Sequence, residues 1–205
     1  FEVLSWLQKY KIISISRVNY LTFYYFCSKN EDVMTILYLV RHGETVDNAH
    51  HIMQGQTPGE LNEKGVQQAK ELAEQLKDEP IDAFVSSDLR RSIHTCELIA
   101  APHGQVVATT PLLRERDWGS FTGKYIPELA NLNDPSQWPD DIESLDALKA
   151  RAKEFLAWVG QEYAGKRVVA VGHGIINKAI QSVYYDKPMN ELRPMGNAEV
   201  RRLAL

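Results

Sequence analysis

ILYLVRHGET, residues 36–45, joins an apolar run to an arginine and a histidine. A short apolar run bounded by polar residues is typical of a buried β-strand. Open α/β sheets place their chemistry at the carboxyl ends of strands, where Arg41 and His42 are expected to lie. A second apolar run, residues 168–171, leads in the same way into Gly-His-Gly at residues 172–174. The two strand-end histidines therefore predict one shared site.

Composition and charge limit the classes of protein that fit. The chain has 205 residues, of which 44% are hydrophobic and 24% charged, which is typical of one ordinary globular domain. A net charge of -4 and a pI near 5.9 predict no nucleic-acid partner and no general attraction to an anionic membrane. Cys27 and Cys96 have neither metal-ligand spacing nor a disulfide framework, which favours a reducing cytoplasmic location.

Residues 1–33 differ from the rest of the chain. They contain two apolar and aromatic runs, at residues 12–16 and 21–26, that are separated by polar residues. Both runs are much shorter than the ~20 residues of a membrane-spanning helix, and no cleavage site typical of a signal peptide follows them. We interpret residues 1–33 as an N-terminal extension, with Met34 as the natural start and one domain over residues 34–205. A leader that contacts a membrane or a partner is the alternative.

Beyond Met34, strand-like and helix-like segments alternate. This pattern predicts a three-layer α/β sandwich whose central sheet is mostly parallel, with helices on both faces. Strands are expected at residues 36–40, 83–86, 106–108, 168–171 and 199–203, and helices at residues 63–77, 89–100, 144–163 and 175–185. Asn62 is a plausible N-cap for the first of these helices.

Four separated motifs resemble the histidine phosphatase superfamily, the phosphoglycerate-mutase-like proteins, in that family's order. They are Arg41-His42-Gly43-Glu44-Thr45 with Asn48, residues 86–91 with Thr95, Leu113-Arg114-Glu115 with Gly119 and Gly123, and Gly172-His173-Gly174. The resemblance covers residues 35–205. It implies the phosphoglycerate-mutase-like α/β fold and phosphoryl chemistry without a cofactor.

The resemblance implies that His42 is the nucleophile. A histidine attacks phosphorus through a neutral ring nitrogen, so the site must fix its tautomer, and Gly43 would let a backbone carbonyl accept the other ring N–H. His173 would be a second imidazole that donates to a phosphoryl oxygen. Taken alone, a histidine after a strand is more often structural, and the complete motif set is what favours the catalytic interpretation.

Arginines are expected around the phosphoryl group, because guanidinium forks match its oxygens. Arg41 and Arg91 are the candidates. The family's pattern of leucine, any residue, arginine, a small residue and a threonine three positions later falls on Leu89, Arg91 and Thr95. Arg91 rather than Arg90 should therefore face the phosphate, and Arg90 should form a surface ion pair.

Amides and a carboxylic acid complete the expected site. Asn48 and Gln54, the latter followed by Gly55, match positions that bind phosphate in the family, although such side chains in loops also satisfy turns. Glu115 matches the family's proton donor for the departing alcohol. Glu44 is a competing carboxylate whose place beside the nucleophile suits an orienting role. Trp118 and Phe121 could line the substrate or belong to the core.

These expectations lead to a metal-independent phosphomonoesterase that hydrolyses a small phosphorylated metabolite through a phosphohistidine. No metal site is expected, because the chain shows no metal-ligand spacing. A phosphoglycerate mutase is the alternative, but the mutase branch carries a long insertion between the counterparts of Glu115 and His173, which here are 58 positions apart (173 minus 115). A catalytically silent phosphate-binding module is a further alternative, and an oligomer is possible.

Six acids and no basic residue lie between Tyr125 and Leu148: Glu128, Asp134, Asp140, Asp141, Glu143 and Asp146. If this stretch overhangs the pocket, its charge should disfavour substrates that carry a second phosphate. The alternative is a solvated surface with a helix cap near Ser144.

Overall fold

The structure, a computed structural model, describes residues 34–129, 132 and 134–205. The expected extension at residues 1–33 lies outside the described residues. Residues 34–205 form one compact unit. The elements within it alternate between strands and helices much as the sequence predicts.

Five strands form one sheet. They are β1 (Ile36–Arg41), β2 (Ala83–Ser87), β3 (Val107–Thr110), β4 (Arg167–Gly172) and β5 (Val200–Ala204), and their order in the sheet is β3-β2-β4-β1-β5. All neighbouring strands pair in parallel except β5, which runs antiparallel to β1 at the edge. The mostly parallel sheet is therefore confirmed.

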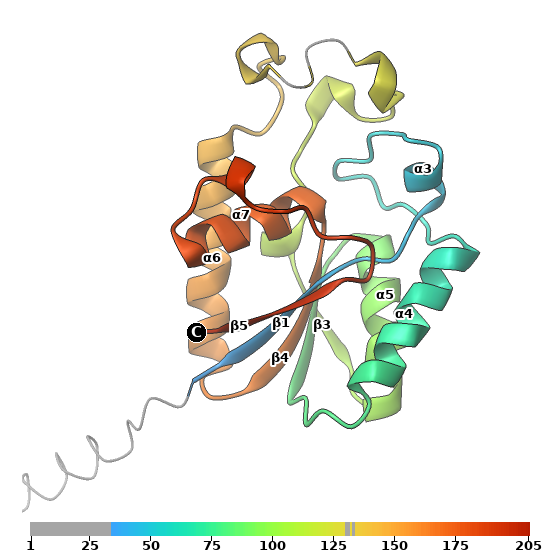
Figure 1. Cartoon of the computed structure of the whole chain (residues 1–205), viewed down its shortest axis with the longest axis vertical. Helices are drawn as coiled ribbons and strands as arrows, with labels where there is room; N and C mark the ends of the chain where they lie inside the picture. Colours follow the sequence, from blue (N-terminus) through green and yellow to red (C-terminus); the bar gives the residue numbers. More distant parts are fainter. Residues whose placement is uncertain (1–33, 130–131, 133) are drawn as a thin grey trace, which may run out of the picture. The chain divides into compact units, whose positions relative to one another are not determined.

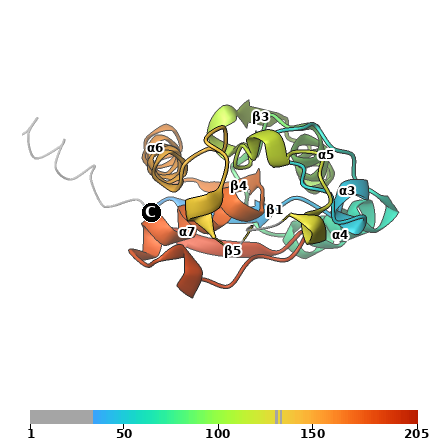
Figure 2. The same cartoon turned by 90° about the horizontal axis from the view of Figure 1, so that it is seen from above.

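Helices cover both faces of the sheet. They are the single turn α3 (Val46–Ala49), α4 (Glu63–Leu76), α5 (Arg90–Ala100), α6 (Leu145–Glu162) and α7 (Gly174–Tyr185). The pair α6 and α7 lies on one face and the pair α4 and α5 on the other (Figures 1 and 2). The Asn62 side chain accepts a hydrogen bond from Gly65 N and Ser144 caps α6 in the same way, so both polar residues begin their helices as expected.

Alternate residues of each strand enter two separate cores. Leu37 and Leu39 of β1 pack in the core beneath α6 and α7, whereas Tyr38 and Val40 pack in the core beneath α4 and α5. A strand buried on both faces needs a continuous apolar run, because its successive side chains point to opposite faces. This explains why the runs in β1 and β4 lack polar residues.

The register of β1 against β4 builds the site. Arg41 pairs with Gly172, and His42 N donates to Gly172 O at 3.0 Å, so the residues that follow both strands emerge at the same edge of the sheet. Sequence spacing separates His42 from His173, but parallel pairing brings the two together.

A segment that the periodicity does not predict covers this edge. Residues 116–129, 132 and 134–144, here called the roof segment, contain short 3-10 turns at Gly119–Phe121, Ile126–Glu128 and Pro135–Gln137. Trp118 and Phe121 pack with Met53 and Ile142 in a third small core. Ile175 packs against both this core and the core beneath α6 and α7.

The loop after β1 touches the first turn of α4 without any intervening side chain. A Cβ added at Gly65 would come within 2.0 Å of Glu44 O, and one added at Gly43 within 2.4 Å of Gly65 O. Real atoms do not approach so closely, so glycine is required at both positions. The contact fixes the loop that carries His42 against a helix.

We expect Gly65→Ala to lower the free energy of unfolding by roughly 1–3 kcal/mol, because the methyl group forces the loop and helix apart. Gly160→Ala in α6 is the matched control, since a Cβ there meets nothing within 4 Å. The control should gain about 0.5–1 kcal/mol from better helix propensity. Urea unfolding of both variants measures the difference, and equal effects would contradict the close contact.

Candidate active site

His42 is held as a neutral imidazole with a defined tautomer. It is 3% exposed, and its Nδ1 lies 2.7 Å from Gly43 O. A carbonyl oxygen can only accept, so Nδ1 carries the proton and Nε2 keeps its lone pair. Burial, followed by the charges of Arg91 and Arg41, lowers the pKa of His42 well below 6.5. Nε2 of His42 is therefore unprotonated at neutral pH.

His173 has the opposite tautomer. Its ring centroid lies 5.0 Å from that of His42, and Arg91 Nε donates to its Nδ1 at 3.2 Å. The proton must then be on Nε2, which is buried and has no partner among the described residues. Burial, Arg91 and His42 lower the pKa of His173 well below its usual value. One imidazole thus offers a lone pair and the other an N–H group.

Arg91 lies at the centre of the site, and Arg90 does not. Arg91 is 1% exposed; its guanidinium donates to Gly55 O at 2.8 Å, to Pro58 O at 3.2 Å and to Thr57 O. Burial lowers its pKa to about 10, which keeps it charged at neutral pH. Arg90 forms a surface ion pair with Glu97 at 3.7 Å. Arg91 thus also binds the loop at residues 55–58, a contact that the motif does not indicate.

Arg41 approaches the site from β1. One terminal nitrogen donates to Met195 O at 2.7 Å, while its buried Nε has no partner among the described residues. Burial lowers its pKa, and the nearby Glu115 and Glu199 oppose that effect. An unpaired guanidinium N–H beside two neutral imidazoles is suited to bind an anionic oxygen.

Asn48 and Gln54 line the cavity next to His42, but both side chains also form hydrogen bonds within the loop that follows β1. Asn48 Oδ1 accepts from Thr45 N at 3.3 Å in the capping box of α3, which leaves its Nδ2 group without a partner in the described part of the chain. Gln54 Nε2 donates to Thr45 Oγ1 at 2.5 Å and to Asp47 Oδ2 at 3.0 Å. Asn197, which sequence reasoning missed, donates to His42 O at 3.1 Å.

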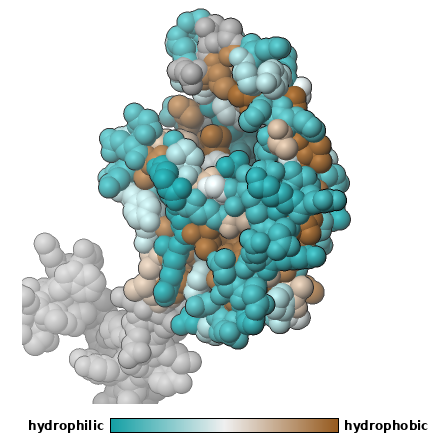
Figure 3. Space-filling view, turned by 45° about the vertical axis from the view of Figure 1, so that its right-hand side comes forward, coloured by the Kyte–Doolittle hydropathy of each residue, from teal (hydrophilic) through white to brown (hydrophobic). Residues whose placement is uncertain are grey.

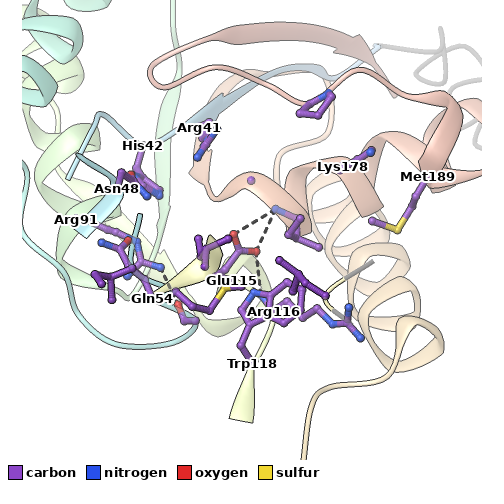
Figure 4. A pocket seen from close by; sticks show the side chains of 18 of the residues that line it. Arg41, His42, Asn48, Gln54, Arg91, Glu115, Arg116, Trp118, Lys178 and Met189 are labelled. Carbon is purple, nitrogen blue, oxygen red and sulfur yellow. Dashed lines mark hydrogen bonds between the residues drawn. The ribbon is translucent and has the colours of Figure 1, made fainter. Parts of the chain in front are cut away.

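Glu115 lies at the amino-terminal end of α7. One of its carboxylate oxygens accepts from Arg116 N at 2.9 Å and from Ile175 N at 3.1 Å (Figure 4). The same oxygen accepts from Ile176 N at 3.1 Å. Glu44, in contrast, pairs with Lys64 at 2.8 Å and accepts from Asn62 at 2.9 Å. Glu44 thus ties the loop to α4, and Glu115 is the carboxylate that lines the cavity.

An ion pair that the sequence analysis did not identify holds the loop that carries Glu115. Arg151 of α6 binds Glu143 with an N–O distance of 2.8 Å. The same guanidinium donates to Leu112 O at 3.1 Å and to Arg114 O at 2.6 Å. A guanidinium that bridges a carboxylate and two carbonyls fixes the backbone next to Glu115.

A cavity of about 470 Å³ lies beside these residues, and of the predicted site residues only His173, which is 0% exposed, is not part of its lining. Arg41, His42, Arg91 and Glu115 line one part of it (Figure 4). Apolar residues line the rest, and Figure 3 shows hydrophobic surface near the hollow below the uppermost part of the molecule. The main apolar residues are Met53, Trp118, Ile126, Leu132, Trp138, Leu145, Ile175 and Met189.

The stretch between Tyr125 and Leu148 does line the cavity, but with apolar side chains, among them Ile126, Leu132 and Trp138. None of the six acids in this stretch, all of them described, lines the cavity, so the alternative of a solvated acidic surface is the one that fits. Asp141 instead accepts from Ser120 N at 2.8 Å, Glu143 binds Arg151, and Asp134 accepts from Ser136 N at 3.1 Å. The acids serve as turn caps and ion-pair partners, which charge counting along the sequence could not distinguish from a lining role.

The described residues contain no cluster of three or more His, Cys, Asp or Glu side chains with a geometry that could hold a metal. In the same residues, no helix is both long and apolar enough to cross a membrane.

Comparison with known proteins adds independent findings. The chain is 38% identical over 172 residues to phosphoglycerate mutase-like protein 4 of Arabidopsis thaliana, covering 78% of this chain and 73% of that one. It is 37% identical over 166 residues to a metal-independent phosphoserine phosphatase of the same plant, covering 74% and 69%. A mycobacterial glucosyl-3-phosphoglycerate phosphatase, solved with VO3, has a TM-score of 0.73 at 29% identity and covers 82% and 91%.

The family match spans nearly all of the described unit. Residues 37–205 match the histidine phosphatase superfamily, branch 1. The fold agrees, since the five-stranded sheet and its helices match the solved phosphatase over most of both chains. The chain belongs to the histidine phosphatase superfamily.

Proposed function

We propose that this chain is a metal-independent phosphomonoesterase of the cytoplasm that hydrolyses a small phosphorylated metabolite through a phosphohistidine. The chain is a phosphoric monoester hydrolase by family, so the proposal concerns its mechanism and its substrate. The observation that carries it is the pair of opposite tautomers at His42 and His173. The lone pair of His42 can attack a phosphorus atom, and the N–H group of His173 can donate to one of the oxygens on that phosphorus.

The first step transfers the phosphoryl group to the protein. The Nε2 lone pair of His42 forms a bond to phosphorus while the bond to the ester oxygen breaks, and Glu115 gives that oxygen a proton. Arg41, Arg91 and His173 donate to the phosphoryl oxygens, where the negative charge is spread in the transition state. These donors are already in place, so little reorganisation is needed at the moment of reaction.

The second step releases inorganic phosphate. Glu115, now a carboxylate, takes a proton from water, and the water oxygen attacks the phosphorus of phospho-His42. The N–P bond breaks and the lone pair returns to Nε2. The hydrogen bonds from Ile175 N and Ile176 N hold the Glu115 carboxylate in one position through both steps.

A phosphoglycerate mutase is the second candidate, because one relative is described as mutase-like. A mutase must keep water from the phosphohistidine and bind a second phosphate. The described residues of the roof segment that line the cavity are mainly apolar. The one arginine among them, Arg116, is already engaged, because it donates to Glu143 O and stacks on Trp118 and Trp138. The names of two phosphatase relatives and the lack of the long insertion favour hydrolysis.

We expect His42→Asn to lose at least a hundredfold in kcat, because covalent catalysis is removed. Release of p-nitrophenol from p-nitrophenyl phosphate in the presence of a metal chelator measures the rate. Rapid acid and alkaline quenching should detect an acid-labile, alkali-stable phosphoprotein in the wild type alone. His42 is buried, so unfolding must be measured alongside; a folded variant that retains more than a hundredth of the rate would contradict the assignment.

The two adjacent arginines give a matched pair of variants. Arg91→Ala should lower kcat/KM by about a thousandfold, since it removes charge stabilisation at the phosphoryl oxygens. Arg90→Ala removes only an exposed ion pair and should change kcat/KM by less than about twofold. Steady-state kinetics with p-nitrophenyl phosphate compare them. A larger loss in Arg90→Ala would place the phosphate on the other side of α5.

The two buried histidines should make stability depend on pH. Their pKa values are lowered in the folded state, so the unfolded chain binds more protons as pH falls below about 6.5. Stability should then fall by roughly 1.4 kcal/mol per pH unit for each histidine until the folded imidazole itself titrates. Urea unfolding between pH 8 and 5 should show a shallower loss in His173→Gln than in the wild type; parallel curves would refute the neutral state of His173.

A further inference from the structure

The catalytic cavity has two parts of different chemistry. Next to His42, two arginines and Glu115 surround the position of the phosphoryl group. The other part is lined mainly by apolar side chains from the roof segment and from Met189. Lys178 of α7 is an exception, since it lines the same cavity and is not part of the motif set (Figure 4). A cation beside apolar walls requires an explanation.

Lys178 lies one helical turn beyond the reacting groups. A Cβ at Gly174 would stand 3.6 Å from the central guanidinium carbon of Arg41 and 3.7 Å from Glu115 Oε2, so this turn of α7 borders the reaction site. Residues four apart share a helix face and are separated by about 6 Å along the axis. Lys178 therefore lies farther along α7 from Arg41 and Glu115 than Gly174 does, in the part of the cavity beyond the motif residues.

The ammonium of Lys178 has no direct partner among the described residues. Within this part of the chain it makes no hydrogen bond or ion pair, whereas Lys64 pairs with Glu44 and Arg116 donates to Glu143 O. Near the amino-terminal end of α7 a cation also gains nothing from the helix dipole.

Glu115, the carboxylate that lines the cavity with Lys178, accepts from the backbone N–H groups of Ile175 and Ile176 instead. None of the acids of the roof segment lines the cavity with Lys178. The half-buried charge thus lacks a structural partner.

Resting on the proposed hydrolysis, we propose that Lys178 determines specificity by binding a carboxylate on the alcohol portion of the substrate. A single ammonium neutralises a single negative charge. A second phosphate would need several converging donors, as the phosphoryl part of the cavity supplies with Arg41, Arg91 and His173. The apolar walls suit an aromatic or branched carbon skeleton between the phosphate and the carboxylate. The substrate class is therefore a phosphomonoester of a carboxylated, partly apolar alcohol.

The test compares two isosteric esters, 4-carboxyphenyl phosphate and 4-carbamoylphenyl phosphate. The wild type should hydrolyse the carboxylate with about tenfold higher kcat/KM, mostly through a lower KM, because hydrogen bonds to charged groups are strong. Lys178→Met should abolish this preference and leave the amide within about twofold. Lys178→Arg should keep it. Lys149→Met, at an exposed position of α6, is the matched charge control and should keep the full preference.

Other outcomes would overturn the inference. An equal loss for both esters in Lys178→Met would mean that Lys178 supports the fold, and an unchanged preference would mean that it does not touch the substrate. If 1,4-phenylene bisphosphate is preferred over the carboxylate and loses that preference in Lys178→Met, the second anion is a phosphate. The proposed hydrolysis is judged separately by p-nitrophenyl phosphate turnover in wild type and His42→Asn, which does not depend on Lys178.

Discussion

The Arg91 guanidinium lies among an imidazole and three backbone carbonyls, with 1% of the residue exposed. None of its hydrogen-bond partners in the described residues is a carboxylate, so its charge is solvated by dipoles rather than paired. That arrangement sets the tautomer of His173, lowers the pKa of His42 and ties the loop at residues 55–58 to α5. A buried guanidinium whose hydrogen bonds go to dipoles is preorganised for an anionic ligand. The remaining parts of the structure hold this arrangement in place.

Much of the scaffold could be predicted because each signal is local. Apolar runs predicted the buried strands, and Asn62 and Ser144 predicted the starts of two helices. An N-cap can be predicted because its side-chain oxygen accepts from a backbone N–H only a few residues away. Motif spacing also separated Arg91 from Arg90, and the structure buries the first and exposes the second. The antiparallel direction of β5 had no such signal, because it depends on the path of the chain after α7.

The roof segment was predicted least well because its order comes from distant contacts. Its turns show neither the helical nor the strand periodicity of apolar residues. The stacking of Arg116 on Trp118 and Trp138 forms only when the segment folds back on itself, so the sequence alone does not indicate it. The charges of Glu143 and Asp141 suggested an acidic lining for the cavity, yet both side chains bind groups of the loop and of α6 instead. Arg151 and Asn197 were missed for the same reason, since each acts on backbone atoms far away in the sequence.

Because Gly43 contacts Gly65 directly, one side of the cavity is more rigid than the other. On the side of His42, backbone meets backbone, so no rotamer change can absorb a displacement there. On the side of the roof segment, side chains such as Trp118 and Met53 separate the backbone from the cavity. Changes in the size of the alcohol portion can therefore be accommodated by exchanging side chains on that side. The backbone that carries His42 is thereby held more rigidly than the opposite wall of the cavity.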